Sequence, residues 1–496
     1  MASNNGAHSN GADATLIPPK GAFIPLLING ADIKHSDTSR HWTLDTGDNN
    51  AGPSATFQGA DAATALQAIE GSQKAFETWS QTRVGERRTL FQKLVEGIRN
   101  NKEAIGQMIK EEIHCDDHWI TIQLVVGVSV IEEAAAAMSS EAAAGQILHS
   151  MVPGAYPLVI QEPYGVILGM APWNAPLILG LRSIVGALAA GNTVIFRGSE
   201  LSPRTHRFIA NLIRWAGFPP GVCNFLLHRP EDAVEVFETC ISHPSVKKAN
   251  FTGSTAVGRS IAVTAAKYLK PVLLELGGKN ISIVLEDADI EKAAEESWDH
   301  AMMNNGQVCM ATDTILVHDA IIKDFTAAIR KHLDKPSSLN YRVITDKARQ
   351  RIIQTLEEIT AAGAKVTTTT SEHPAIPAAL IEDVPADSKH HRTEFFGPLL
   401  AVQPISSEDD AVRLVHATDH GLSCSIFSKD TLRAVNLGRR LDVGAVHINA
   451  GSVHDEGNFP HGGTMNSGYG RRPYGVLPRL VSLKLKFELH QQVQLR

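Results

Sequence analysis

Two short stretches of the chain carry a carboxylate and a cysteine whose side chains suit acyl chemistry. Glu275 stands in Leu274-Glu275-Leu276-Gly277-Gly278-Lys279, and Cys309 ends Gly306-Gln307-Val308-Cys309. A cysteine forms a thioester readily, and a nearby carboxylate can activate the water molecule that hydrolyses it. If an acceptor removes hydride between these steps, the pair can oxidise an aldehyde to an acid. Taken alone, each residue could equally be a buried structural thiol or a surface carboxylate.

Further motifs follow in a fixed order along the chain, two before Glu275 and three after Cys309. They are Gly169-Met170-Ala171-Pro172-Trp173-Asn174-Ala175-Pro176, Asn250-Phe251-Thr252-Gly253-Ser254-Thr255-Ala256-Val257-Gly258, Glu394-Phe395-Phe396-Gly397-Pro398, Pro460-His461-Gly462-Gly463 and Ser467-Gly468-Tyr469-Gly470-Arg471. The whole set resembles the aldehyde dehydrogenase superfamily, from about residue 20 to about residue 490. Residues 168–176 and 179–182 are most similar to its salicylaldehyde and vanillin dehydrogenase branch.

The resemblance implies catalytic roles for three residues. Cys309 is the expected nucleophile, which attacks the aldehyde to give a thiohemiacetal. The side-chain amide of Asn174, with the Cys309 main-chain N–H, is expected to bind the negative oxygen; the alternative for Asn174 is an Asx turn. Glu275 is the expected general base for thioester hydrolysis. Relatives that pass the acyl group to coenzyme A lack this carboxylate, so water is the expected acceptor. The other four cysteines are expected to be structural: Cys115, Cys223, Cys240 and Cys424.

The expected cofactor is a nicotinamide dinucleotide, with NAD favoured and NADP possible. Residues 253–258 place glycines at a helix start, where main-chain N–H groups favour a pyrophosphate, although Gly-Ser-Thr also makes an ordinary helix cap. Glu200 matches the carboxylate that binds the adenine ribose and repels a 2′-phosphate. Arg197 replaces the usual lysine, and its bulkier guanidinium could bond to the ribose or tolerate a 2′-phosphate. The full set of expected cofactor residues is Trp173, Arg197, Glu200, Gly253, Ser254, Thr255, Ala256, Val257, Gly258, Glu394 and Phe396.

The sequence says less about the substrate. Trp119 and Arg182 stand where aromatic-aldehyde relatives carry pocket residues, so an aromatic or hydrophobic aldehyde is expected. Helix packing is the alternative for Trp119, and a surface salt bridge is the alternative for Arg182. No metal site is expected near Trp119, because nothing completes the polar run 114–118. Two positions depart from the family pattern: His461 where phenylalanine is usual, and Met465 where lysine is frequent.

The composition limits the class of protein. The 496 residues are 43% apolar and 20% charged, which is ordinary for a globular protein. A net charge of −7 does not suggest a nucleic-acid surface. No apolar run is expected to span a membrane. Five scattered cysteines indicate neither a zinc site nor a disulfide framework, and a reducing, cytoplasmic location suits a reactive thiol.

Strands that alternate with helices predict an α/β protein with an open parallel sheet of the dinucleotide-binding type. The pattern restarts after Gly278, which predicts a second α/β domain that carries the catalytic cysteine. Two extended segments fit neither domain. In the superfamily that the chain resembles, such segments form a β arm that pairs between subunits. A homodimer or homotetramer is therefore expected. The expected parts are a disordered tail (1–19), the NAD-binding domain (20–146 and 163–276), the catalytic domain (277–476) and the oligomerisation arm (147–162 and 477–496).

Together these expectations describe an NAD-dependent enzyme that oxidises an aldehyde to its carboxylic acid. Two alternatives remain open at this point. One is a tailoring dehydrogenase that acts on an aldehyde of a larger natural product. The other is a non-catalytic relative with a binding or structural role, which the presence of both Cys309 and Glu275 disfavours.

Overall fold

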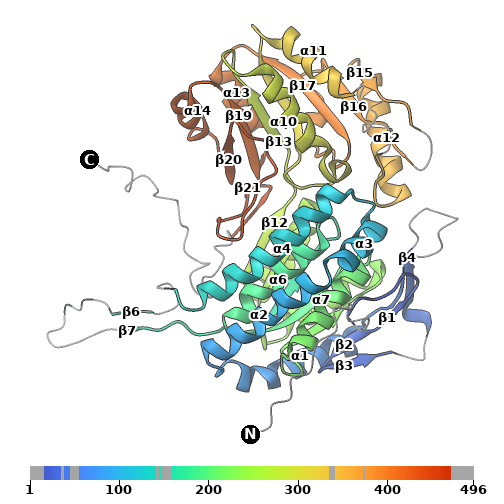
Figure 1. Ribbon diagram of the computed structural model, residues 1–496, viewed down its shortest axis with the longest axis vertical. Coiled ribbons are helices and arrows are strands. Elements are labelled where there is room, and N and C mark those ends of the chain that lie inside the picture. Colours follow the sequence, from blue (N-terminus) through green and yellow to red (C-terminus); the bar gives the residue numbers. More distant parts are fainter. Residues whose placement is uncertain are drawn as a thin grey trace.

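The structure is a computed structural model of the full chain. It describes residues 16–34, 38–44, 55–140, 145–147, 149, 151, 158–333, 341–371 and 375–470. Most of the expected tail, the expected C-terminal part of the arm and Arg471 therefore lie outside the described residues. Two lobes are visible in Figure 1, each built on its own sheet.

The first lobe contains an eight-stranded sheet with five parallel strands at its centre. The central strands are almost wholly buried and rich in Val, Ile, Leu and Phe, as expected for a parallel sheet covered on both faces. In sheet order the strands are β22 (Gly468–Tyr469), β12 (Val272–Leu276), β11 (Val246–Gly253), β8 (Val166–Met170), β9 (Thr193–Arg197), β10 (Cys223–Leu226), β2 (Leu26–Ile28) and β3 (Ala31–Ile33).

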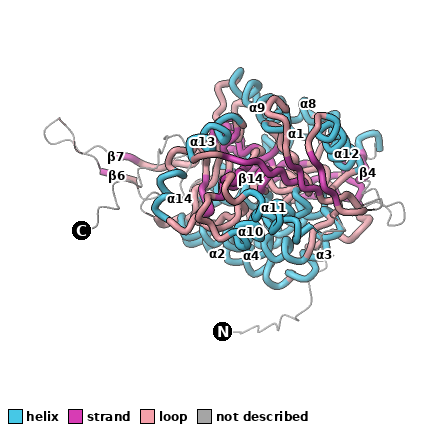
Figure 2. Tube along the Cα trace, turned by 90° about the horizontal axis from the view of Figure 1, so that it is seen from above, coloured by secondary structure: helices cyan, strands magenta, loops and turns pink. Residues whose placement is uncertain are grey.

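Helices cover both faces of this sheet, as the view from above shows (Figure 2). One face carries α1 (Ala62–Trp79), α8 (Ala233–Ser242) and α9 (Thr255–Lys267). The other carries α6 (Pro176–Ala189) and α7 (Pro203–Ala216), with α2 (Val84–Asn100), α3 (Lys102–Ile113) and α4 (Asp117–Ala137) packed outside them. Beside them lie the short helices η1 (Thr38–Arg40) and η2 (Pro230–Asp232), and a small sheet of β1 (Phe23–Ile24), β5 (Ala55–Gln58) and β4 (His41–Leu44).

One local expectation, on the start of α7, needs correction. The sequence suggests Ser199 as the cap of α7, but the cap position is Ser202, directly before Pro203 at the first helical position. By length and composition alone, one described helix, α4, could cross a membrane. One third of that apolar window is buried, and α4 packs against α2, α3 and α6.

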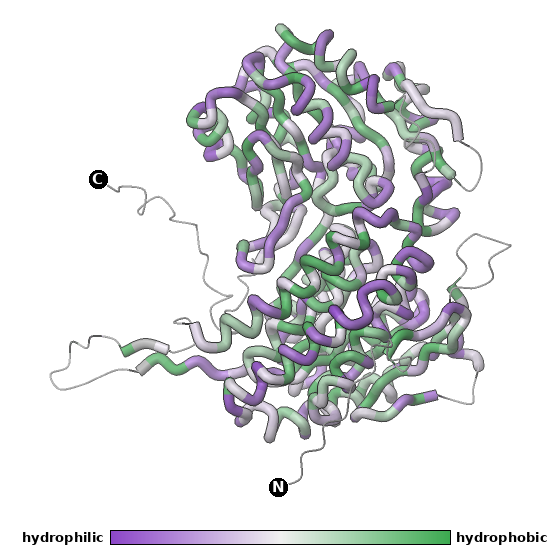
Figure 3. The backbone as a smooth tube through the Cα atoms, viewed as in Figure 1, coloured by the Kyte–Doolittle hydropathy of each residue, from purple (hydrophilic) through white to green (hydrophobic). Residues whose placement is uncertain are grey.

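The second lobe contains a seven-stranded sheet in which six strands are parallel. In order they are β15 (Lys365–Thr368), β16 (Ala379–Glu382), β17 (Leu399–Ile405), β14 (Thr312–His318), β13 (Asn280–Val284), β19 (Ser423–Phe427) and β20 (Ala445–Ile448). Its helices are α10 (Ile290–Met302), α11 (Ile322–Leu333), α12 (Asp346–Ala361), α13 (Glu408–Ala417) and α14 (Thr431–Gly438), with η3 (Met303–Gly306) and η5 (Lys389–His391). Apolar residues gather along both sheets (Figure 3), and buried clusters lie on both faces of this one.

The chain crosses between the lobes twice near Glu275. After β12 it passes through Gly277 and Gly278 into β13 of the second sheet. It returns through β21 (Thr464–Met465), which pairs with β18 (His420–Gly421), and then β22 pairs antiparallel with β12, with Gly468 opposite Glu275. The β22 strand therefore belongs to the first sheet, although it lies within the range expected for the second domain.

A two-stranded arm projects away from both lobes (Figures 1 and 2). It consists of β6 (Gln146–Ile147) and β7 (Leu158–Val159), which pair antiparallel as the expected hairpin requires. The turn at Pro153-Gly154 lies outside the described residues.

Candidate active site

The expected site residues gather at the carboxyl ends of four neighbouring parallel strands of the first sheet. Glu275 lies in β12, Gly253 ends β11, Asn174 follows β8 and Arg197 ends β9. Ligands of open parallel sheets bind in this crevice. Cys309 approaches the same edge from the second lobe, in the loop between η3 and β14.

The loop that carries Cys309 has an unusual backbone. Asn304, Asn305 and Gly306 all adopt left-handed conformations, with φ of 50°, 59° and 73°. Asparagine and glycine tolerate this region best, which explains the Asn-Asn-Gly run. A Cβ on Gly306 would collide with the main chain of Gly397 and Pro398. The loop therefore rests directly on the segment that carries Glu394 and Phe396.

Hydrogen bonds from buried amides fix both ends of this loop. Asn304 Nδ2 donates to the carbonyl oxygen of Asn174 at 3.0 Å, and the Gln307 side chain accepts the main-chain N–H of Ile344 at 2.9 Å. Beyond the cysteine, Asn280 Nδ2 donates to the Cys309 carbonyl oxygen at 2.7 Å and to the Ala311 carbonyl oxygen at 2.9 Å. These contacts hold the main chain of Cys309 between the two lobes.

Asn174 points its side chain at the cysteine loop. Its Nδ2 donates to the carbonyl oxygen of Gln307 at 3.0 Å, two residues before Cys309. A side-chain amide has two N–H donors, so the second can serve an oxygen bound near Cys309. The main-chain carbonyl of Asn174 accepts from Trp119 Nε1 at 3.0 Å. Trp119 is 4% exposed, so a buried indole holds the main chain of Asn174 in position.

Cys309 is the partly exposed cysteine, whereas Cys115, Cys223, Cys240 and Cys424 are buried. Burial, followed by the nearby carboxylates of Glu275 and Glu394, raises the pKa of the Cys309 thiol well above its usual range, and Arg182 opposes this. The raised pKa disfavours the thiolate, and a positive charge or a proton acceptor close to the sulfur favours it.

Glu275 lies within a buried polar group that contains both signs of charge. Its Oε1 lies 2.5 Å from His461 Nε2 and 3.8 Å from Arg182 Nη1. Thr252 donates its hydroxyl to the other carboxylate oxygen at 3.2 Å. Arg182 Nη2 also bonds to Asp455 Oδ2. The guanidinium of Arg182 thus faces two carboxylates.

Residues 253–258 form the turn from β11 into α9. Ser254 is the cap of α9, and its hydroxyl accepts the main-chain N–H of Val257 at 3.4 Å. Ser254, Ala256 and Val257 are exposed, so this helix start faces solvent. A Cβ on Gly258 would collide with Leu276 of β12, so glycine lets α9 pack closely on the sheet. This arrangement suits the pyrophosphate of a dinucleotide.

Arg197 and Glu200 lie at the end of β9, one strand further along the sheet. Arg197 Nη1 lies 3.5 Å from Met170 Sδ, and Ser199 donates its hydroxyl to Glu200 at 3.3 Å. Burial lowers the pKa of the Arg197 guanidinium, and the Glu200 carboxylate partly offsets this. Each residue thus keeps a charged group at the edge where an adenine ribose would bind.

The 394–398 segment contributes a carboxylate and an aromatic ring from the second lobe. Glu394 Oε1 is buried and has no hydrogen-bond partner within the described ranges, so a ribose hydroxyl suits it. Burial raises the pKa of Glu394 to about 8. Phe396 meets Trp173 edge to face, with ring centroids 5.9 Å apart. The two rings come from different lobes.

Lys279 anchors this segment and was not singled out by sequence reasoning, although it stands in the Glu275 motif. Its Nζ lies 3.3 Å from Asp313 Oδ1 and 3.3 Å from the centre of the Phe395 ring. Asp313 also accepts the main-chain N–H of Phe395 at 2.9 Å. Asp455 was missed entirely, because it lies in a loop without a motif. The structure places no metal-binding group of His, Cys, Asp or Glu among the residues it describes.

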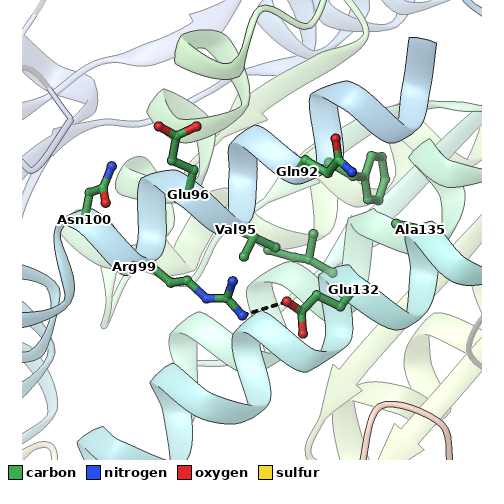
Figure 4. A pocket seen from close by; sticks show the side chains of 9 residues that line it. Gln92, Val95, Glu96, Arg99, Asn100, Glu132 and Ala135 are labelled. Atoms are coloured by element: carbon green, nitrogen blue, oxygen red, sulfur yellow. Dashed lines mark hydrogen bonds and ion pairs between the residues drawn. The ribbon is translucent and has the colours of Figure 1, made fainter. Parts of the chain in front are cut away.

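A separate hollow lies between α2 and α4, on the outside of the first lobe (Figure 4). Phe91, Val95 and Ile131 form its apolar floor, and Arg99 and Glu132 pair at its rim at 2.7 Å. It contains none of the expected site residues.

Known proteins resemble this chain over most of its length. Residues 46–477 match the model of the aldehyde dehydrogenase family. Vanillin dehydrogenase from Pseudomonas fluorescens is 35% identical over 461 residues, which is 90% of this chain and 94% of that protein. A salicylaldehyde dehydrogenase from Pseudomonas putida G7, solved with salicylaldehyde, has a TM-score of 0.87 and 30% identity, and the match covers 92% of this chain and 96% of that one.

Two further solved structures carry cofactors. A betaine aldehyde dehydrogenase from Staphylococcus aureus with NAD+ has a TM-score of 0.86 and 25% identity, with 91% and 92% of the two chains covered. An NADP-dependent glyceraldehyde-3-phosphate dehydrogenase from Bacillus halodurans with NADP has a TM-score of 0.85 and 26% identity, with 92% and 97% covered. Because the family match and these similarities span most of the chain, the chain belongs to the aldehyde dehydrogenase family.

Proposed function

We propose that this aldehyde dehydrogenase oxidises an aromatic aldehyde to its carboxylic acid through a thioester on Cys309. The observation that carries the proposal is the convergence of Asn174, Glu275 and Cys309 from three separate segments on one sheet edge. Asn174 bonds to the loop before the cysteine, and the Glu275 carboxylate lies close enough to act on the thiol electrostatically.

In the first step the S–H bond of Cys309 breaks, its proton passes to water, and the sulfur bonds to the aldehyde carbon. The carbonyl oxygen gains negative charge, and the Asn174 amide and the Cys309 main-chain N–H donate to it. A bound nicotinamide dinucleotide supplies the hydride acceptor. Loss of hydride from the same carbon restores the carbonyl and leaves a thioester.

In the second step Glu275 removes a proton from a water molecule, and the water oxygen bonds to the acyl carbon. The carbon–sulfur bond then breaks, and the acidic proton of the product restores the Cys309 thiol as the carboxylate leaves. The acyl acceptor is water and not coenzyme A, because the carboxylate of Glu275 is present.

NAD is the proposed cofactor, and NADP remains a possible second one. The exposed start of α9 fits a pyrophosphate, and the unpartnered Glu394 oxygen fits a ribose hydroxyl. Trp173 and Phe396 are proposed to flank the nicotinamide end. Glu200 favours NAD because a carboxylate repels a 2′-phosphate. Solved relatives contain either cofactor, so Glu200 and Arg197 carry the preference.

An aromatic substrate is proposed because the similar curated proteins act on vanillin and salicylaldehyde. Trp119 and Arg182 are proposed to shape the pocket mainly by holding Asn174 and Glu275, since both side chains are buried against those residues.

The arm supports a homo-oligomer, either a dimer or a tetramer. The arm exposes four large apolar side chains, with exposed fractions of 37–101%: Ile147, Met151, Val159 and Ile160. A second copy of this chain would bury these residues and pair the open strand edges. A cytoplasmic location stays a prediction.

A steady-state screen tests the proposed function. Aromatic and aliphatic aldehydes are compared with NAD and NADP, and the reduced cofactor is followed by absorbance. Turnover of benzaldehyde-type substrates is expected, with a pre-steady-state burst of NADH and slow turnover in Glu275→Gln. Absence of aldehyde oxidation with either cofactor, or acceleration of the wild type by coenzyme A, contradicts the proposal.

A further inference from the structure

A histidine replaces the phenylalanine that is usual at position 461, and it contacts Glu275 directly. His461 Nε2 lies 2.5 Å from Glu275 Oε1, and His461 Nδ1 lies 3.7 Å from Asp455 Oδ2. The imidazole therefore stands between two carboxylates, one at each ring nitrogen. An aromatic residue without nitrogen would fill the volume but would make neither contact.

These groups become more exposed in the order Glu275, His461, Asp455. Glu275 is 2% exposed, His461 is 7% exposed, and the Asp455 side chain is 13% exposed. The second oxygen of Glu275 accepts the Thr252 hydroxyl at 3.2 Å, and Thr252 is itself buried. A proton that arrives on Glu275 thus has His461 Nε2 2.5 Å away, and the more exposed Asp455 carboxylate lies 3.7 Å from the other ring nitrogen.

This proton must leave in every catalytic cycle. Near neutral pH, hydrolysis of the thioester by water gives one carboxylate, one thiol and one proton. The acidic proton of the product restores the Cys309 thiol, so the proton that Glu275 accepts from water must leave before Glu275 can act again. A carboxyl group sealed from solvent releases its proton slowly unless a neighbouring group accepts it.

We propose that His461 is a positioning residue that carries the proton of the hydrolytic water from Glu275 to Asp455 and solvent. An O–H bond of water breaks, and the proton passes to a Glu275 oxygen. His461 then takes that proton at Nε2 and releases its Nδ1 proton to Asp455. The inference rests on the proposed function, because only thioester hydrolysis delivers the proton to Glu275.

The charges around His461 support this role. Glu275 faces it from β12, Asp455 from the loop after β20, Arg182 from α6 and His447 from β20. Burial alone would lower the pKa of His461, but the carboxylates of Glu275 and Asp455 outweigh burial and the Arg182 charge, so the pKa is raised. A proton that His461 accepts from Glu275 is therefore stabilised on the imidazole by both carboxylates.

The main experiment compares His461→Gln with the wild type at two steps. Stopped-flow absorbance measures the burst of NADH, which reports thioester formation, and the steady-state rate reports hydrolysis. We expect an unchanged burst amplitude but hydrolysis slowed about tenfold. This is less than the roughly 100- to 10,000-fold effect of a direct acid–base group, because His461 acts through Glu275. The wild-type hydrolysis rate should follow an ionisation above about pH 6.5, and the glutamine variant should lose it.

His332→Gln is the matched control. His332 is 7% exposed, as His461 is, and lies in α11 against Trp298, outside the site. It should keep the wild-type pH profile. His461→Phe, which restores the usual residue, should behave as His461→Gln does. A wild-type pH profile for hydrolysis in both position-461 variants overturns the relay.

A measurement on the wild type keeps the inference testable if both variants fail to fold. Steady-state rates are measured in mixtures of light and heavy water. A curved dependence on deuterium fraction is expected, because more than one proton moves during the relay. A linear dependence contradicts it. An absence of NADH formation in the wild type would instead contradict the proposed function itself, so the two failures are distinguishable.

Discussion

Trp119 donates its indole N–H to the main-chain carbonyl of Asn174 at 3.0 Å. The same carbonyl accepts from Asn304 Nδ2 at 3.0 Å, while the Asn174 side chain donates to Gln307. Helix α4 and the cysteine loop are thus joined through one asparagine. The indole acts on the site through the position of Asn174.

Trp119→Phe should slow oxidation because it keeps most of the ring and removes this hydrogen bond. One neutral hydrogen bond contributes about 0.5–1.5 kcal/mol, so kcat should fall roughly two- to tenfold. Trp79→Phe is the matched control, since Trp79 Nε1 donates to the carbonyl oxygen of Asn192 at 3.1 Å away from the site. Both variants should lose a similar amount of thermal stability, and equal kcat values for the two would contradict the role of Trp119.

Alkylation by iodoacetamide should label Cys309 before any other cysteine. Cys309 is partly exposed, whereas the other four are buried. Because its thiol pKa is raised, labelling of the free protein should be slow at pH 7 and should accelerate as the pH rises. Peptide mapping by mass spectrometry identifies the labelled residue, and Cys309→Ala should be both inactive and unlabelled. Full activity after complete labelling of Cys309 would argue against its role.

Gly306→Ala should disrupt the site because a Cβ there collides with Gly397 and Pro398. Gly306 also has a φ of +73°, which alanine adopts only with strain. Gly363→Ala separates the two effects, since Gly363 has a φ of +100° but no neighbour within 4 Å of its Cβ. Loss of activity is expected for Gly306→Ala, and only a modest loss of melting temperature for Gly363→Ala.

Local patterns predicted much of this architecture. The buried strands around 166–170 and 193–197 read directly from their apolar runs, and the turn at 253–258 lies between a strand and a helix as expected. Each strand, helix and turn can be recognised from a few consecutive residues, because its pattern of apolar and turn-forming residues is local. The two-lobe α/β fold is therefore largely predictable, and the family match agrees with it.

The partners of the site residues were not predictable, because they come from distant segments. Nothing near Arg182 in sequence indicates that it faces Glu275 and Asp455. The departure at His461 was visible, but its contact with Glu275 depends on the return of the chain through β22. Ser199 and Ser202 are both serines shortly before Pro203, so the sequence alone does not show which of them precedes α7.

Glu394→Gln should stabilise the free protein at alkaline pH. The folded pKa of Glu394 is about 8, above its ordinary value of 4.5. The unfolded chain therefore ionises first, and stability is lost as pH rises from about 4.5 to about 8. The melting-temperature gain of the variant should be small at pH 5 and at least about 2 °C at pH 9.

Glu358→Gln provides a comparison of opposite sign. Lys389 lowers the pKa of Glu358, so its stabilising effect is present above pH 4.5 and its loss should not raise the melting temperature at pH 9. If Glu394→Gln shows no gain at pH 9, the carboxyl group is not enclosed in solution. The same variant should also raise the KM for NAD, since Glu394 is the proposed ribose ligand.

Arg197→Lys restores the usual family residue and tests the cofactor preference. If the guanidinium only bonds to the adenine ribose, the variant should change the KM for NAD modestly and leave kcat unchanged. If it accommodates a 2′-phosphate, the wild type should use NADP well and the variant should lose some of that use. The charge is the same in both forms, so any difference comes from the bulk and planarity of the guanidinium. Because Glu200 lies beside Arg197 and repels an added phosphate, we expect a wild-type preference for NAD in kcat/KM. A measured preference for NADP would overturn this assignment without affecting the roles of Cys309, Glu275 and Asn174.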